Sequence, residues 1–109
     1  MPTTYKVLGQ ENPSATTLTS LYTVPASTST VVSTVTIANL ANSSGTFRVA
    51  VRPAGASIVN KHYIAYDTTI AALDTLTLTL GITLAATDVL SVYASSATMA
   101  FAAYGSEIS

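Results

Sequence analysis

The segment "DTLTLTLGITL", residues 74–84, alternates leucine with threonine until Gly81 interrupts the pattern. Leu76, Leu78 and Leu80 therefore fall on one side of an extended chain, with threonines on the other side. Threonine at every second position favours a strand, because a β-branched side chain loses rotamer freedom in a helix and packs well on a pleated sheet. The segment predicts a strand with one face toward a core and the other toward water or a partner.

The same period of two recurs in "STVTIANL", "FRVAVRP", "DVLSVYA" and "ATMAFAAYG", and no window of 11 or more residues shows a convincing helical period. Clusters of Gly, Pro, Asn, Asp and Ser separate these runs at regular intervals, which is typical of turns. Pro53 is expected to end a strand, because it has no N–H to donate to a neighbour. We predict about eight strands, near residues 5–9, 17–24, 31–40, 46–53, 59–67, 74–81, 88–94 and 98–105.

Eight short antiparallel strands with this spacing predict an all-β fold, an antiparallel β-sandwich of the jelly-roll type. The length of 109 residues suits one domain, and no repeat, linker or low-complexity tail divides residues 1–109. Residues 1–13 have two interpretations, an edge strand or an N-terminal arm that orders on a neighbouring subunit. The edge strand is the favoured one.

The composition excludes several function classes. Only 8% of the residues are charged, against about 25% in ordinary domains, and no cluster of Lys and Arg predicts nucleic-acid binding. We expect no secretory signal and no membrane span, since the start lacks a basic head before an apolar run and no stretch approaches 18 apolar residues. The absence of cysteine excludes disulfides and thiolate metal sites, and fits folding in a reducing cytosol.

Threonine and serine take the place of the missing charge, with 19 and 13 copies. Neutral hydroxyl and alanine surfaces cost less to desolvate than ionic surfaces, and they lack the charge repulsion that keeps small domains apart. This composition favours a subunit packed against copies of itself. A soluble monomer that is merely rich in threonine is the alternative.

No constellation for catalysis, cofactor binding or metal binding is legible in the chain, so we expect no enzyme and no cofactor. The carboxylates Asp67, Asp74, Asp88 and Glu107 are scattered, and Asp beside a turn usually accepts backbone N–H bonds. The single histidine, His62, is expected to be a plain strand or interface residue. A trimer that brings three copies of it to an axis to bind an ion is the less favoured alternative.

The candidate interface residues are two arginines, three tyrosines and the histidine. Arg48 and Arg52 lie four positions apart and project from the same face of one predicted strand. They form either a solvated face or a bidentate anchor for a carboxylate of a neighbouring subunit. Tyrosine suits interfaces because its ring can be buried while its hydroxyl stays wet. The full set is Arg48, Arg52, Tyr5, Tyr93, Tyr104 and His62.

Some of the six tyrosines are expected to be ordinary core or edge residues, Tyr63 or Tyr66 among them. The alternation of "HYIAY" places His62, Ile64 and Tyr66 on one side of the strand, with Tyr63 and Ala65 on the other.

Six segments make the chain resemble small structural proteins of tailed bacteriophages, cyanophages especially. They are "YKVLGQ", "TTLTSLYTVPASTSTVVSTVTIAN", "TFRVAVRPAGA", "KHYIAYD", "LTLGITLAATDVLSVYASS" and "FAAYGSEI". None of them is a catalytic signature. The resemblance implies a sandwich subunit of the virus particle, assembled in the host cytoplasm and located in the virion.

Within this resemblance two functions are open. The favoured one is a capsid cement or decoration protein, a homotrimer that binds the major capsid protein on the outside of the head. The alternative is a tail, fibre or baseplate component that touches a host glycan. An adhesin should show solvent-facing aromatic rings beside Asp, Asn or Gln in one loop, and "ANLANSSG" is the only segment that suggests this.

Overall fold

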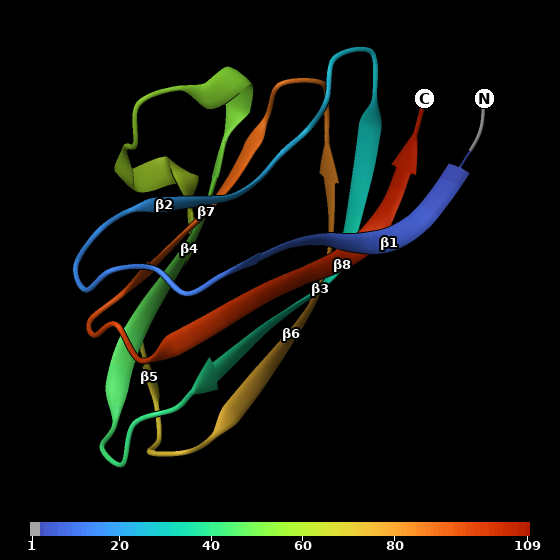
Figure 1. The fold of residues 1–109 in the computed structure, drawn as a ribbon. Helices are drawn as coiled ribbons and strands as arrows, with labels where there is room; N and C mark the ends of the chain where they lie inside the picture. Colours follow the sequence, from blue (N-terminus) through green and yellow to red (C-terminus); the bar gives the residue numbers. More distant parts are fainter. Residues whose placement is uncertain (1–2) are drawn as a thin grey trace.

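The computed structural model describes residues 3–109, which form eight strands and two short 3-10 turns, η1 and η2 (Figure 1). The predicted number of strands is confirmed. Most bounds lie within a few residues of the predicted ones. The strands are β1 Thr3–Glu11, β2 Thr19–Thr23, β3 Ser29–Asn39, β4 Gly45–Arg52, β5 Tyr63–Ile70, β6 Thr75–Leu84, β7 Val89–Ala94 and β8 Met99–Ile108, with η1 Pro53–Gly55 and η2 Asn60–His62 between β4 and β5.

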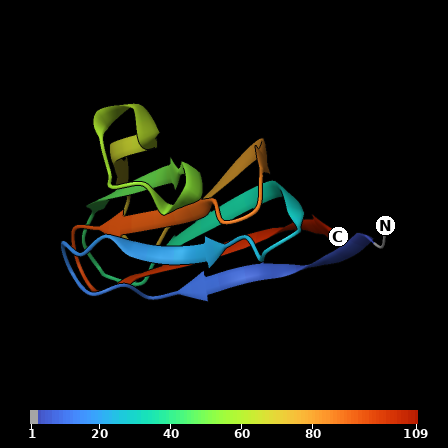
Figure 2. The ribbon, with the colours of Figure 1, turned by 90° about the horizontal axis from the view of Figure 1, so that it is seen from above.

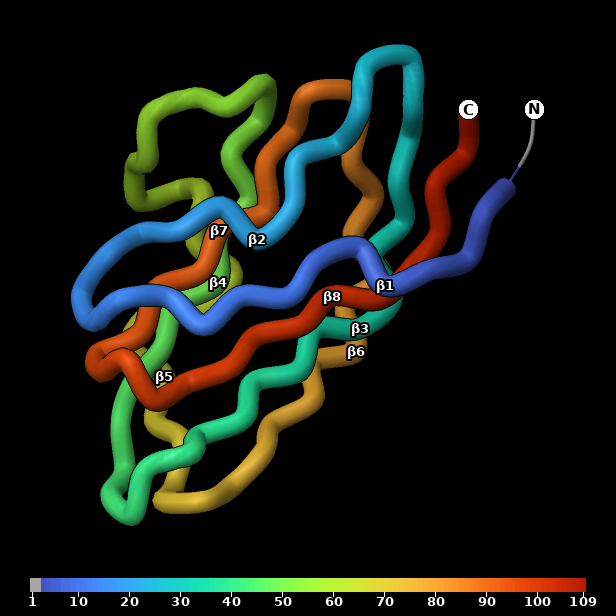
Figure 3. The backbone as a smooth tube through the Cα atoms, viewed as in Figure 1, coloured from blue at the N-terminus to red at the C-terminus, as the bar shows by residue number. Residues whose placement is uncertain are grey.

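The strands form two four-stranded antiparallel sheets, in the orders β1-β8-β3-β6 and β2-β7-β4-β5. Strand β1 pairs with β8, β2 with β7, β3 with β6 and β4 with β5, so the first half of the chain pairs with the second half in reverse order. This winding is that of a jelly roll. The tube in Figure 3 shows β1 and β8 side by side, with both ends of the chain at one end of the molecule. The predicted β-sandwich is confirmed.

The core lies between the two sheets and is built from the inward positions of the alternating strands. Phe47 and Val49 of β4 are fully buried, and Phe47 meets Phe101 of β8 edge to face at 6.4 Å between ring centroids. Leu76, Leu78 and Leu80 face the core as predicted but are only partly buried, because β6 is an edge strand.

The sheet β1-β8-β3-β6 is kinked along one line across its strands. On either side of Tyr104 in β8, a neighbouring strand carries an extra residue: Leu8 of β1 opposite the step from Ala103 to Tyr104, and Ser33 of β3 opposite the step from Tyr104 to Gly105. Strand β6 adds a further residue relative to β3 at Gly81, whose φ is +62°. Such bulges sharpen the local twist of a sheet, and glycine supplies the left-handed conformation without strain.

Strand β5 begins four residues later than predicted, at Tyr63 rather than near residue 59. Residues 53–62 form a loop with the turns η1 and η2, which stands on the outer side of the β2-β7-β4-β5 sheet (yellow-green in Figure 2). The loop is fixed by Arg52, which donates to the carbonyl oxygen of Ala56 at 3.2 Å. The sequence pattern could not reveal this, because the loop carries apolar residues such as Ile58 that suit a strand.

The segment left open between an arm and an edge strand forms β1, which pairs with β8 at the edge of its sheet. Residues 1 and 2 of the predicted segment 1–13 lie outside the described residues. Residues 3–109 contain no helix with the length and apolarity that a membrane crossing requires.

Candidate functional site

The outer face of the β1-β8-β3-β6 sheet carries no charged side chain among the described residues. Lys6, Glu11 and Glu107 belong to these strands, but the pairing register places them at inner positions. Lys6 and Glu11 are nevertheless exposed and border two hollows of this surface along β1. We call this surface the uncharged face. By register its members are Thr3, Tyr5, Val7, Gln10, Ser29, Val31, Thr34, Thr36, Ala38, Thr75, Thr77, Thr79, Thr83, Ala100, Ala102, Tyr104, Ser106 and Ile108.

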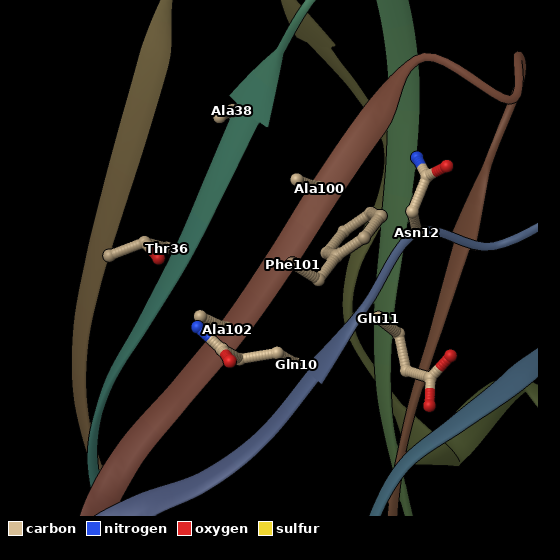
Figure 4. A pocket seen from close by; sticks show the side chains of 8 residues that line it. All are labelled: Gln10, Glu11, Asn12, Thr36, Ala38, Ala100, Phe101 and Ala102. Atoms are coloured by element: carbon tan, nitrogen blue, oxygen red, sulfur yellow. The ribbon is translucent and has the colours of Figure 1, made fainter.

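Two of the predicted interface tyrosines lie on the uncharged face. Tyr5 is 84% exposed and Tyr104 is 37% exposed, and both border a hollow of about 420 Å³. A second hollow of about 360 Å³ lies beyond the kink, where Thr36, Ala38, Ala100 and Ala102 present only small side chains and Gln10 lies beside them (Figure 4). The outward side chains of the face are therefore neutral, with tyrosines at one end and two shallow hollows that Lys6 and Glu11 border.

The outer face of the other sheet carries a cluster of three tyrosines around an arginine and an aspartate. Arg48 Nε donates to Asp67 Oδ1 at 2.7 Å, and Nη2 donates to Oδ2 at 3.3 Å. The guanidinium carbon lies 4.2 Å from the ring centroid of Tyr66 and 4.1 Å from that of Tyr93. Tyr63 meets Tyr66 edge to face at 4.8 Å between centroids. We call these five residues the Tyr66 cluster.

The expectation that Tyr63 and Tyr66 point to opposite sides of their strand is wrong. The register of β5 on β4 shifts twice, at Ile64 and again between Ala65 and Thr68. These bulges break the alternation. Asp67 lies in the second bulge with a φ of +48°, a left-handed conformation that Asp tolerates better than most residues. The bulges bring the two rings and the carboxylate together beside Arg48.

The ion pair in the cluster holds the guanidinium in its charged form. Hydrogen bonding to Asp67 raises the pKa of Arg48 further above its ordinary value, although partial burial acts in the opposite direction. Cation–π contacts with two rings add to the attraction. The carboxylate partner that the sequence suggested for Arg48 lies in its own chain.

Arg52, the last residue of β4, and His62, in η2, lie at the two ends of the loop of residues 53–62. Arg52 Nε donates to the buried hydroxyl of Ser91 at 3.0 Å, which ties the loop to β7. His62 is buried, and its Nδ1 accepts the backbone N–H of Val59 at 3.2 Å. Within residues 3–109 no three His, Cys, Asp or Glu side chains gather to hold a metal ion.

Two of the scattered carboxylates cap turns as predicted. Asp88 accepts the backbone N–H groups of Ala54 and Ala85, each at 2.9 Å, and Asp74 accepts that of Thr75 at 2.8 Å. Asp67 is instead the partner of Arg48.

Glu107 forms a network between the sheets. It accepts the hydroxyl of Tyr22 at 2.5 Å and the ammonium of Lys6 at 3.2 Å. The hydrogen bond from Tyr22 lowers the pKa of Glu107, and burial together with this bond raises the pKa of Tyr22 to about 12. The network joins β2 of one sheet to β1 and β8 of the other.

The structure brings together only some of the predicted interface residues. Arg48 and Tyr93 are cross-strand neighbours in the Tyr66 cluster, whereas Tyr5 and Tyr104 lie on the opposite side of the molecule. Tyr63, Tyr66 and Asp67 were not among the predicted site residues. One feature of the sequence could have indicated the bulge at this site: Asp67 directly follows a strand-like run. Asp tolerates the left-handed conformation that a bulge can require better than most residues do.

No family model, curated protein or solved structure matches the chain.

Proposed function

We propose that this chain is a non-enzymatic structural protein of a tailed-phage particle, a decoration protein that stabilises the assembled head as a homotrimer. The observation that carries the proposal is the uncharged face, on which eighteen outward positions across four strands include no charge. Protein surfaces usually carry charges that keep domains apart, and the centres of interfaces are depleted of them.

Tyr5, Val7 and Tyr104 supply apolar area at one end of this face. Tyrosine is enriched at interfaces, and the neighbouring Thr and Ala side chains cost little to desolvate. A strand edge adjoins the same region, since β1 is paired on one side only. These features suit contact with other copies of the chain and with the major capsid protein.

A decoration protein acts by mass action. It binds the assembled lattice and not the separate subunits, so its binding free energy is added to the stability of the shell. Each trimer that contacts two or more neighbouring capsomers makes their separation more costly. This action requires binding surfaces and no catalytic group, and the outer faces of a jelly roll can supply such surfaces.

The test is the location of the protein on purified particles. Particles are treated with increasing denaturant, and the protein is followed in heads and in isolated tails. Departure from heads together with a fall in the temperature of genome release supports the proposal, and retention on isolated tails contradicts it. Light scattering of the purified protein tests the trimer, which should have three times the 11.2 kDa mass of the chain. A monomer mass at all concentrations contradicts the trimer.

A tail, fibre or baseplate component is the second candidate function. The observation that favours it is the Tyr66 cluster, which places an exposed aromatic ring beside Asp67. Such a combination is expected of a glycan-binding surface.

A further inference from the structure

The Tyr66 cluster exposes aromatic surface next to a hollow. Tyr66 is 56% exposed, and with Tyr63 and Asn60 it lines a cavity of about 330 Å³. Small-ligand sites are concave, largely apolar and lined by aromatic rings with a few polar groups. Its volume falls at the lower end of the range of such sites, which suits a small ligand.

The polar groups beside the rings retain capacity for further hydrogen bonds. An ionised carboxylate offers about four acceptor positions, and Arg48 uses one on each oxygen of Asp67. The side chain of Asp67 is 46% exposed, so its remaining lone pairs are open to the solvent. Asn60 is also exposed, and its amide offers both donors and acceptors. Vicinal hydroxyls of a sugar pair well with planar groups of this kind.

The cluster is also held in place before any ligand binds. Arg48 is stacked on Tyr66 and Tyr93 and is bonded to Asp67 by two hydrogen bonds. Asp67 is fixed by a bulge, and Tyr66 by its edge-to-face contact with Tyr63. A site whose side chains are already ordered loses less entropy on binding.

We propose that the Tyr66 cluster binds a neutral saccharide, with the C–H face of a sugar ring on Tyr66 and its hydroxyls on Asp67 and Asn60. The ligand is neutral because Arg48 and Asp67 compensate each other, and an anion would have to compete with Asp67 for the guanidinium.

The site and the uncharged face belong to different sheets and lie on opposite outer sides of the sandwich, so a subunit that covers one can leave the other free. The proposal deepens the second candidate function and is also compatible with a decoration protein on the head. Its outcome is independent of where the chain is located on the particle, and the two proposals can fail separately.

The test is saturation-transfer NMR on the purified protein. The probes are the methyl glycosides of glucose, galactose, mannose and N-acetylglucosamine, with glucuronic acid and sialic acid as anionic probes. We expect transfer to at least one neutral glycoside, and a Kd about tenfold weaker in Tyr66→Ala. Asp67→Asn should also weaken binding, and it keeps the size of the side chain and tolerates the same backbone conformation.

The matched control is Tyr5→Ala, which removes an even more exposed tyrosine ring from the uncharged face and should leave saccharide binding unchanged. The thermal unfolding of each variant shows that it is folded. The proposal is overturned if no neutral glycoside gives transfer, if binding survives Tyr66→Ala, or if only the anionic sugars bind.

Discussion

The two outer faces of the sandwich arise from the same alternation of residues, but they differ in chemistry. No loop covers the uncharged face in the part of the chain that the structure describes, and the face consists mainly of threonine and alanine with a few tyrosines. The other face carries Arg48, Arg52 and three tyrosines, and the loop of residues 53–62 covers part of it. Alternation decides which side chains enter the core. Bulges and the one long loop decide what each outer face presents.

The largest effect should come from the kink beneath the uncharged face. A Cβ at Gly105 would lie 2.0 Å from the carbonyl oxygen of Val31 in the neighbouring strand, so Gly105→Ala forces β8 and β3 apart. We expect a loss of about 3 kcal/mol in the free energy of unfolding, measured with urea. Gly81→Ala is the control, since nothing lies within 4 Å of its Cβ and only the left-handed conformation costs about 1 kcal/mol. Equal losses in the two variants would contradict the close-packing explanation.

The next effect concerns the loop on the opposite face. Arg52→Ala removes the bonds to Ser91 and Ala56 and leaves the buried Ser91 hydroxyl without its donor. The expected loss is about 2 kcal/mol, with faster amide exchange across residues 53–62.

Arg48→Ala serves as the control for Arg52→Ala, because it removes the other arginine of the same strand. Its partner Asp67 is half exposed, so the loss should be about 1 kcal/mol or less. The loop should keep its protection in amide exchange. Unchanged exchange in Arg52→Ala would show that this arginine does not hold the loop.

A smaller effect should appear with pH at the network that joins the two sheets. Because the pKa of Glu107 is lowered in the folded state, its contribution to stability is complete above its ordinary value of 4.5 and is lost as the pH falls through the folded value. Glu107→Gln should lose about 1 kcal/mol at pH 7 and less at pH 3, measured by urea unfolding. A difference between the two proteins that does not change with pH would exclude the carboxylate as the cause.

The smallest effect on stability should come from a charge on the uncharged face. Thr36 pairs with Ala102 and Thr77 in the centre of this face, and Thr36→Lys should change the free energy of unfolding by less than about 0.5 kcal/mol. Thr36→Lys should nevertheless weaken both the association of the trimer and its binding to heads. Ser57→Lys, which adds the same charge to the exposed loop of the other face, should leave trimer association and head binding unchanged. Equal effects of the two lysines on assembly would argue against the uncharged face as the interface.

Much of the fold follows from the sequence because the core obeys a period of two. The leucines of residues 76–80 predicted β6, and Pro53 marked the end of β4. The pairing of β1 with β8 could not be predicted, because strand order depends on contacts between distant segments.

The candidate site was less predictable. The register that places Tyr93 beside Arg48 is a property of two paired strands, and the bulges that bring Tyr66 there interrupt the pattern used to read the strand. The sequence therefore predicted which residue types suit an interface, but not the two faces on which they lie.

The most direct test of the difference between the faces is hydroxyl-radical footprinting of the tyrosines, on the free protein and on purified particles that carry it. In the free subunit Tyr5, Tyr66 and Tyr104 are all accessible. The uncharged face is predicted to be covered on the particle. Tyr5 and Tyr104 should therefore lose most of their reactivity toward hydroxyl radicals, whereas the reactivity of Tyr66 should be unchanged. Protection of Tyr66 with Tyr5 and Tyr104 still reactive would contradict the account.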